Sequence, residues 1–253
     1  MHAALIGHTG FVGGTLARAR PFAASFNSAN IADIRGRRFD LVVCAGVSAV
    51  KWLANKESAR DRAAIDGLIG HLEQVTAGHF VLVSTIDVYR ETAGRDERDA
   101  PPEDGLHPYG LHRLMLERFV AERFAAHSIV RLPALFGSGL KKNAVFDLMH
   151  ANQTEKIVPN AAFQWYPLRR FADDLDRVRA AGIPLINITA APVTMAAIRD
   201  RFFPGVPMAA ALAAPPRYDL RSVHDALLGG TGGYHVSEAE MFAALAAFLA
   251  EPT

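Results

Sequence analysis

The chain has little of what marks secreted or redox-active proteins. It contains one cysteine among 253 residues, which excludes an internal disulfide. Cys44 lies in the apolar run Leu41–Ala45, where a thiol is expected to be a buried strand residue rather than a nucleophile. This cysteine usage fits a reducing, cytoplasmic setting.

Charge of one sign and long hydrophobic stretches are also lacking. The 27 Lys and Arg residues nearly balance the 26 Asp and Glu residues, so there is no electrostatic footprint for nucleic acid. No apolar stretch approaches the roughly 20 residues that cross a bilayer. The first apolar strand begins near Met1 with no basic or apolar leader before it, so we expect a protein that is neither secreted nor membrane-embedded.

Metal-ligand spacings are missing from the sequence. It has ten histidines, but none are paired as in H-E-x-x-H or a similar motif. We therefore expect no metal site. His107 and His112 lie on either side of Tyr109 in the sequence. A lone histidine near the start of a helix is more often exposed to solvent than catalytic, so neither histidine is predicted to be catalytic.

The strongest pattern that is present is an alternation of apolar, β-rich runs with helical segments. The strand-like runs are Ala3–Ile6, Ala23–Asn27, Asp40–Ala45, Phe80–Ser84, Ser128–Leu132 and Pro184–Ile188, and the helical segments are Gly13–Ala19, Asn55–Ala77 and Tyr109–Ala126. Such alternation predicts an α/β fold with a doubly wound, Rossmann-like parallel sheet.

The organisation of the chain changes after Phe136. The strand–helix rhythm breaks down there, which predicts a small lobe built from separated pieces. We predict a dinucleotide-binding domain at 1–140, with 170–190 returning to it, and a discontinuous substrate lobe at 141–253. Between Phe26 and Asp40 there is too little chain for a full crossover helix. A capping box at Ser237–Glu240 predicts a final helix through Ala250.

A glycine-rich turn follows the first strand, with the spacing G-x-x-G-x-x-G. Glycines at this point permit a tight turn and a close approach of backbone to a pyrophosphate, which the helix N-terminus attracts. The alternative is an ordinary glycine-rich turn, because the spacing departs from the commoner G-x-G-x-x-G. The residues predicted to hold the cofactor here are Gly7, Thr9, Gly10, Phe11, Val12 and Gly13.

A hydroxyl, a phenol and a cation are predicted to meet at one site. Thr85 ends a buried strand, and Tyr109 and Arg113 are four residues apart on a predicted helix, so they share a face. A cation about 4 Å from the phenol, at an effective dielectric of about 20, favours phenolate by up to ~4 kcal/mol. We therefore expect Arg113 to lower the pKa of Tyr109 and make it a usable proton donor and acceptor.

Taken in order, these segments resemble the extended short-chain dehydrogenase/reductases, a group of NAD(P)-dependent sugar epimerases, dehydratases and reductases. The glycine turn matches that family's cofactor turn, Ala45–Gly46 its small-residue cofactor wall, Ser84–Thr85 with Val88–Tyr89 its hydroxyl-bearing strand, Tyr109 its catalytic tyrosine and Arg131–Gly137 its loop beside the nicotinamide. The resemblance implies catalytic roles for Thr85, Tyr109 and Arg113. It also implies cofactor contacts from Ala45, Gly46, Tyr109, Arg113 and Pro133.

The sequence departs from the family at its tyrosine–lysine motif. Arg113 stands where the family has a lysine that binds the nicotinamide ribose, and the planar guanidinium is not an equivalent replacement. Ile86 and Asp87 stand where the family's dehydratases have an Asp–Glu pair, which argues against water elimination.

The residues after the second strand bear on cofactor choice. Asn27–Asn30 contains no carboxylate where NAD-preferring members hold the ribose hydroxyls. Asp33 is one substitute, and Arg35, Arg37 and Arg38 offer a 2′-phosphate contact instead. The cofactor is expected to be NAD(P), with a slight preference for NADP.

The resemblance implies an NAD(P)-dependent oxidoreductase or epimerase that acts on a hydroxyl or ketone of a carbohydrate or nucleotide-sugar, and a homodimer. Ala45–Glu57 resembles the dTDP-sugar ketoreductases, which favours simple reduction. The alternative is a non-catalytic NAD(P)-binding sensor or scaffold, for which Arg113 is the best argument. Phe163, Trp165 and Tyr166 are candidates either for stacking on a sugar or base or for the core of the lobe.

Overall fold

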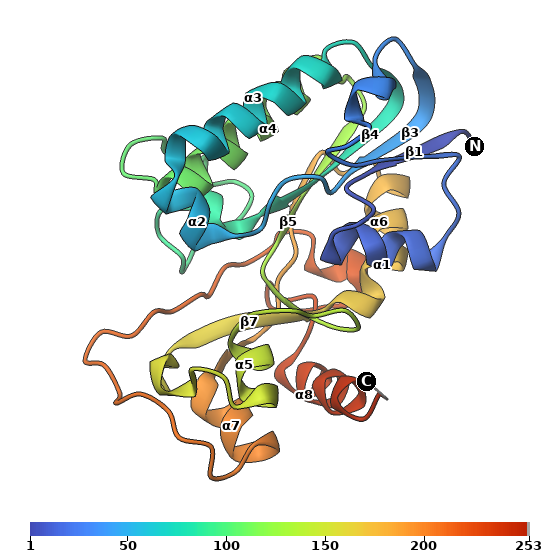
Figure 1. Ribbon diagram of the computed structural model, residues 1–253. Helices are drawn as coiled ribbons and strands as arrows, with labels where there is room; N and C mark the ends of the chain where they lie inside the picture. Colours follow the sequence, from blue (N-terminus) through green and yellow to red (C-terminus); the bar gives the residue numbers. More distant parts are fainter. Residues whose placement is uncertain (252–253) are drawn as a thin grey trace. The chain divides into compact units, whose positions relative to one another are not determined.

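The computed structural model describes residues 1–251, which divide into two compact units. The first unit comprises Met1–Arg90, Glu97–Leu132 and Arg170–Asn187, and the second comprises Glu91–Asp96, Pro133–Arg169 and the chain from Ile188 onward. Figure 1 shows the elements of both units.

The first unit is built on a six-stranded parallel sheet in the order β2-β1-β3-β4-β5-β8. Its strands are β1 (Ala3–Ile6), β2 (Ala24–Phe26), β3 (Arg38–Cys44), β4 (Thr76–Thr85), β5 (His127–Leu132) and β8 (Leu185–Asn187). All six predicted runs are strands of this sheet, so the predicted doubly wound parallel sheet is confirmed. The largest difference at a strand's start is at β4, which begins four residues before the predicted run.

Helices cover both faces of the sheet, with α3 and α4 on one face and α1 and α6 on the other (Figure 1). The helices of this unit are α1 (Phe11–Ala19), α2 (Lys51–Lys56), α3 (Ser58–Leu72), α4 (Pro108–Arg123) and α6 (Phe171–Ala180), and the 3₁₀ turns are η1 (Ile31–Ile34) and η2 (Ile86–Val88). Between β2 and β3 the crossover is reduced to η1, as its length predicted.

The predicted helix Asn55–Ala77 is wrong at both ends. The helical region begins earlier, at Lys51, and is divided at Glu57 into α2 and α3. Its last predicted residues belong to β4, because Thr76 and Ala77 pair with the start of β3. Strand pairing with a neighbour far along the chain overrides the local helical pattern there.

Alternate residues of the strands form the core beneath α3 and α4. Val42, Cys44, Phe80 and Leu82 are at most 1% exposed and pack together with apolar side chains of both helices. Burial raises the pKa of the Cys44 thiol to about 11, so the thiol stays protonated and unreactive. The prediction that Cys44 is a buried strand residue is confirmed.

A buried ion pair fastens α4 to the sheet. Arg131 of β5 donates from its Nη2 to Glu117 Oε2 at 2.6 Å and from its Nε to both carboxylate oxygens, and each side chain is 3% exposed. Ser84 of β4 donates to the same carboxylate at 2.5 Å. The charge of Glu117 therefore raises the pKa of Arg131 despite its burial.

The second unit has a three-stranded sheet in the order β6-β7-β9, in which β7 is parallel to β6 and antiparallel to β9. Its elements are β6 (Ala134–Phe136), α5 (Ala144–His150), η3 (Thr154–Lys156), β7 (Ala162–Pro167), η4 (Leu168–Arg170), β9 (Pro192–Thr194), α7 (Met195–Phe202), η5 (Asp225–Leu228) and α8 (Glu238–Leu249). The capping box at Ser237 and Glu240 is present at the start of α8, as predicted.

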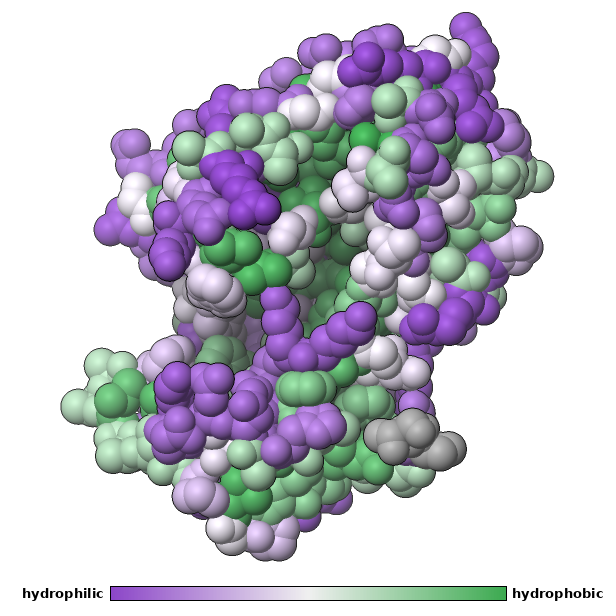
Figure 2. All heavy atoms as spheres, in the orientation of Figure 1, coloured by the Kyte–Doolittle hydropathy of each residue, from purple (hydrophilic) through white to green (hydrophobic). Residues whose placement is uncertain are grey.

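The surfaces of the units are mixed in polarity. Figure 2 shows hydrophilic and hydrophobic residues interspersed on the faces in view. Across residues 1–251, the large hydrophobic side chains that are mainly exposed are Met1, Trp52, Leu212 and Val223. Within the same residues, no helix combines the length and the apolar character needed to cross a bilayer.

Replacing Glu117 with alanine tests the buried ion pair. The change leaves the Arg131 guanidinium buried without its counter-charge, which costs about 3–5 kcal/mol of the free energy of unfolding. Urea denaturation followed by circular dichroism measures it. Glu122→Ala, at an exposed position of the same helix, is the matched control and is expected to stay within about 0.5 kcal/mol. Equal effects of the two substitutions would contradict the role of the pair.

Candidate active site

The glycine turn between β1 and α1 is in close contact with other backbone segments. Gly7 has φ +88°, and a Cβ added there would lie 2.4 Å from the Ala45 oxygen. A Cβ on Gly13 would lie 2.1 Å from the Gly7 oxygen, and one on Gly46 would lie 2.8 Å from the Ile6 side chain. The turn and the segment Ala45–Gly46 after β3 therefore pack together, and they do so only because these positions lack side chains.

Gly10 is less crowded than these glycines, although an added Cβ would still make one tight backbone contact. The nearest atom to an added Cβ is the Gly7 oxygen at 3.3 Å, and Gly10 is exposed as the N-cap residue of α1 with no side chain capping that helix. Thr9 is also exposed, and Phe11 and Val12 are half-buried. An uncapped helix start beside a bare glycine fits the pyrophosphate of a dinucleotide.

The chain after β2 is held by its own amide side chains. Asn30 Oδ1 accepts from the Asn27 N–H at 2.7 Å, and Asn27 Oδ1 accepts from the Ala29 N–H at 2.9 Å. His8, in the glycine turn, is hydrogen-bonded to the Phe26 carbonyl at the end of β2. No carboxylate lies in this loop, and the nearest one along the chain is exposed Asp33 in η1.

The three arginines suggested for a 2′-phosphate lie in different surroundings, and their role stays a prediction. Arg38 begins β3, and β3 runs parallel to β1, which places it at the edge of the sheet opposite the glycine turn. Arg37 stacks over the rings of Phe26 and Phe39, and Arg35 donates to His71 at the end of α3.

Thr85 and Tyr109 meet at the carboxyl edge of β4. The Thr85 hydroxyl accepts the Asp87 N–H at 3.1 Å and lies near enough to the Tyr109 phenol to lower its pKa. Tyr109 is 8% exposed, and its N–H donates to Asn55 Oδ1 of α2 at 3.0 Å. The predicted hydroxyl and phenol thus lie at the same edge of the sheet.

The first turn of α4 packs directly on η2, which sets the position of Tyr109. A Cβ added to Gly110 would lie 2.2 Å from the Asp87 oxygen, so a larger residue would push the helix away. His107 caps α4 by accepting the Gly110 N–H at its Nδ1, 3.0 Å away. Burial and the nearby Lys51 lower the pKa of His107, which keeps the ring in the neutral form that can accept this bond.

Arg113 is held by the protein itself. Its Nη1 and Nη2 donate to Asp61 Oδ2 and Oδ1 at 2.6 and 2.9 Å, and Nη2 also donates to the Ser48 carbonyl at 2.6 Å. The guanidinium carbon lies 3.9 Å from the centre of the Tyr109 ring. His112 binds the same Asp61 carboxylate at 2.7 Å. Arg113 therefore stacks on the ring while its charge is matched by a carboxylate.

The expected effect of Arg113 on Tyr109 is wrong in its net direction. The pKa of Tyr109 is raised, because burial of the phenol and the negative charges of Asp87 and Asp61 outweigh the lowering by Arg113 and by the Thr85 hydrogen bond. The simple estimate from one cation omitted desolvation and the two carboxylates. Tyr109 is a neutral phenol at physiological pH.

Sequence reasoning missed the residues that hold the side chains and backbone of this site in place. Lys51 of α2 donates to Asp87 Oδ1 at 2.7 Å, and Asn55 and Asp61 support Tyr109 and Arg113 as described above. Lys51, Asn55 and Asp61 lie 36, 54 and 52 positions before their partners, and no motif connects them to these partners. Pro133, predicted to contact the nicotinamide, is the first residue of its segment in the second unit, and its role stays a prediction.

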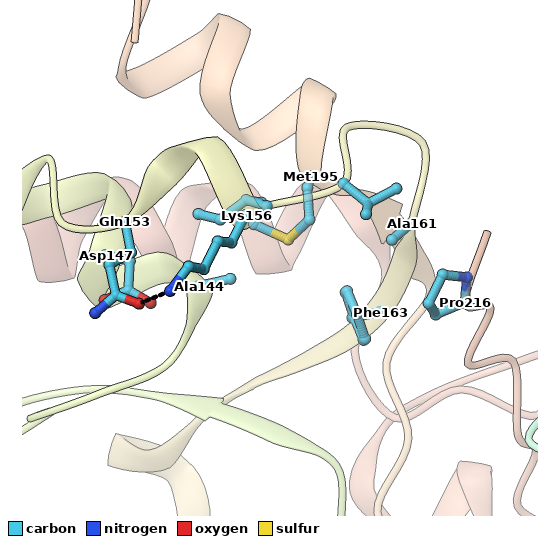
Figure 3. A pocket seen from close by; sticks show the side chains of 10 residues that line it. Ala144, Asp147, Gln153, Lys156, Ala161, Phe163, Met195 and Pro216 are labelled. Carbon is cyan, nitrogen blue, oxygen red and sulfur yellow. Dashed lines mark hydrogen bonds between the residues drawn. The ribbon is translucent and has the colours of Figure 1, made fainter. Parts of the chain in front are cut away.

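The second unit has a cavity of its own, of about 340 Å³ (Figure 3). Phe163 and Met195 contribute to an apolar wall, and Asp147, Gln153 and Lys156 contribute polar groups, with Lys156 donating to Gln153 at 2.7 Å. Of the predicted aromatic cluster, Trp165 and Tyr166 are at most 2% exposed and belong to the core of the unit. Phe163 alone of the three lines the cavity.

Comparison with known proteins yields matches in structure only. No protein-family model and no curated protein sequence matches the chain. A dTDP-4-dehydrorhamnose reductase of Bacillus anthracis, in complex with NADP, superposes with a TM-score of 0.77 at 15% identity over 99% of both chains. The corresponding reductase of Clostridium acetobutylicum gives 0.76 at 16% identity over 98% of both.

A UDP-galactose 4-epimerase also superposes, with a TM-score of 0.71 at 15% identity, over 98% of this chain and 97% of that one. The similarity extends over both units and not the sheet alone. The chain shares its fold with these solved reductases and with the epimerase.

Proposed function

We propose that the protein is an NAD(P)H-dependent reductase that converts a ketone of a nucleotide-linked sugar to an alcohol. The observation that carries this proposal is the position of the Thr85 hydroxyl near the Tyr109 phenol, whose pKa the hydroxyl lowers. In a parallel sheet the carboxyl ends of all strands lie at one edge, so this pair shares an edge with the glycine turn after β1. Two strand spacings, or about 10 Å, separate β1 from β4 across the sheet.

The proposed cofactor site consists of the glycine turn, the first turn of α1 and the Ala45–Gly46 wall. Gly10 leaves room for a phosphate, and the N–H groups that begin α1 provide donors and a favourable dipole. The similar reductase of Bacillus anthracis is in complex with NADP. The absence of a carboxylate in Asn27–Asn30 supports NADP, because an acid there would repel a 2′-phosphate and bind a free ribose hydroxyl instead.

The residues of the site supply the proton and the orientation for this reaction. A nicotinamide cofactor, when bound, supplies the hydride. The Thr85 hydroxyl donates a hydrogen bond to the carbonyl oxygen, and Tyr109 transfers its phenolic proton to that oxygen as the alcohol forms. Solvent then returns a proton to Tyr109. Without a carboxylate at buried Ile86, the site lacks the acid–base pair expected for water elimination.

The protonation state of Tyr109 favours reduction over epimerisation. An epimerase that works through a keto intermediate requires the same group first to take a proton from the substrate and then to return one. A phenol whose pKa is raised is poorly suited to the first step and remains available for donation across the physiological range. The similar structures include both reductases and an epimerase.

One observation favours a second candidate function, that of an NAD(P)-binding sensor or scaffold. The guanidinium at the family's lysine position is bound to Asp61 and to the Ser48 carbonyl, so it is committed to contacts within the protein. Tight cofactor binding without turnover on any nucleotide-sugar ketone, in both the natural protein and Arg113→Lys, would support this candidate.

The cofactor site is tested by Gly10→Asp. Aspartate is a favourable N-cap residue, so the variant is expected to fold, but its carboxylate would occupy and repel the phosphate position. Titration with NADPH and NADH, followed by fluorescence, should show saturable binding to the natural protein and at least about 100-fold weaker binding to the variant.

The matched control for this test is Gly67→Asp, on the exposed surface of α3, where an added Cβ meets open space. It is expected to bind both cofactors normally. Equal binding by Gly10→Asp and the natural protein would contradict the assigned cofactor site, and no binding by the natural protein would contradict the proposed function.

The catalytic role of Tyr109 is tested by Tyr109→Phe. The phenylalanine ring keeps the stacking on Arg113 but has no proton to donate, so kcat for ketone reduction should fall about 10²–10⁴-fold. Reduction is measured as NADPH oxidation with a panel of nucleotide-linked keto-sugars. The affinity for NADPH is expected to change little, and unchanged kcat would rule out Tyr109 as the proton donor.

A further inference from the structure

Asp61 is a largely buried carboxylate at the candidate active site, and no sequence motif connects it with Tyr109 or Arg113. It lies on α3, is 9% exposed in its side chain, and accepts from both Nη atoms of Arg113 and from the ring of His112. Arg113 is 4% exposed. A two-point Arg–carboxylate contact in a buried position fixes the direction of the guanidinium as well as its charge.

The contact with Asp61 determines how Arg113 meets Tyr109. The guanidinium lies 3.9 Å from the centre of the ring and also donates to the Tyr109 carbonyl at 3.1 Å. The guanidinium therefore contacts the face of the aromatic ring while its two Nη groups point to Asp61. Because Asp61 matches its charge, the phenol faces an ion pair in place of a lone cation.

We propose that Asp61 is a positioning residue that fixes and neutralises Arg113, so that Tyr109 enters the reaction as a protonated phenol and the site works as a ketone reductase. This inference rests on the proposed function for its consequence, the direction of the reaction, but the electrostatic contact itself does not depend on it.

The other groups that face Tyr109 act in the same sense or balance one another. Asp87 favours the neutral phenol, and its partner Lys51 offsets part of that charge. Thr85 favours phenolate through its hydrogen bond. The His107 ring, centred 6.1 Å from the Tyr109 ring, has a lowered pKa and is neutral at alkaline pH. Among the charged groups Arg113 has the largest effect on the phenol, so changes to its ion pair with Asp61 should shift the pKa of Tyr109.

Three variants test the proposal through the direction in which each one shifts the pKa of Tyr109. In Asp61→Asn the guanidinium is left without its counter-charge, so the pKa of Tyr109 should fall by about 1–3 units. In Arg113→Gln the carboxylate is left alone beside the phenol, so the pKa of Tyr109 should rise. The double variant Asp61→Asn/Arg113→Gln removes both charges, and the pKa of its Tyr109 should lie between those of the two single variants.

The primary measurement is the ultraviolet absorbance of tyrosinate as a function of pH. Each form is compared with the same form carrying Tyr109→Phe, so that the difference reports Tyr109 among the five tyrosines of the chain. Asp66→Asn is the matched control, since this residue is on the same helix but is 51% exposed and paired with Arg62. It should leave the titration unchanged.

Rates give the second measurement. In Asp61→Asn the alkaline limb of ketone reduction should move to lower pH, and oxidation of the product alcohol at neutral pH should become faster relative to reduction. An unchanged Tyr109 titration in Asp61→Asn, or shifts of the same sign in both single variants, would overturn the proposal.

The two levels of inference remain separable in these experiments. Absence of NADPH binding or of turnover contradicts the proposed function but leaves the tyrosinate titration as a test of the Asp61 contact. If Asp61→Asn does not fold, Arg113→Gln and the double variant still give different expectations: the pKa of Tyr109 should be higher in the first, which keeps the Asp61 carboxylate, than in the second, which lacks it. Failure of that difference to appear would overturn the proposal.

Discussion

Close contact between backbone segments at glycine positions sets the positions of the loops and helix starts at the carboxyl edge of the sheet. Gly13 brings α1 against the turn after β1, and Gly7 meets Ala45 after β3. Gly110 brings the first turn of α4 against Asp87. Each approach leaves no room for a Cβ, so the glycine turn and Tyr109 have their positions set by the main chain, and the side chains that follow can specialise in binding and chemistry.

Most of the fold was predictable because it depends on local patterns. Apolar runs of β-branched residues identified the six parallel strands, and the glycine spacing located the turn between β1 and α1. The strands of the second unit escaped prediction because β7 pairs with β6 and β9, which lie in distant parts of the chain, and no alternation with helices marks them. The predicted end of α3 was wrong because Thr76 pairs with β3 and is the first residue of β4.

The candidate site was predictable in its chemistry and less so in its electrostatics. Thr85 and Tyr109 could be named from their places at a strand end and a helix start. The sign of the pKa shift of Tyr109 could not, because it depends first on burial and then on Asp87 and Asp61, which oppose the effect of Arg113. Asp61 is 48 positions earlier in the sequence and shares no motif with Tyr109. Contacts between residues on separate elements leave little trace in a single sequence.

Helix α4 contains two buried charges one turn apart, and each has its partner on a different element. Arg113 pairs with Asp61 of α3, and Glu117 pairs with Arg131 of β5. Satisfied pairs of this kind specify one arrangement of the elements, because any other register would leave a charge buried alone. In this unit they fix the rotation of the helix that carries Tyr109.

The helix cap formed by His107 links the geometry of α4 to acidity. The ring accepts the Gly110 N–H through Nδ1, and a protonated imidazole has no lone pair with which to do so. Since the pKa of His107 is lowered by burial and by Lys51, the cap persists somewhat below the ordinary histidine range. In more acidic surroundings the loss of this bond would loosen the helix start, and the phenol one residue before Gly110 would lose its fixed orientation.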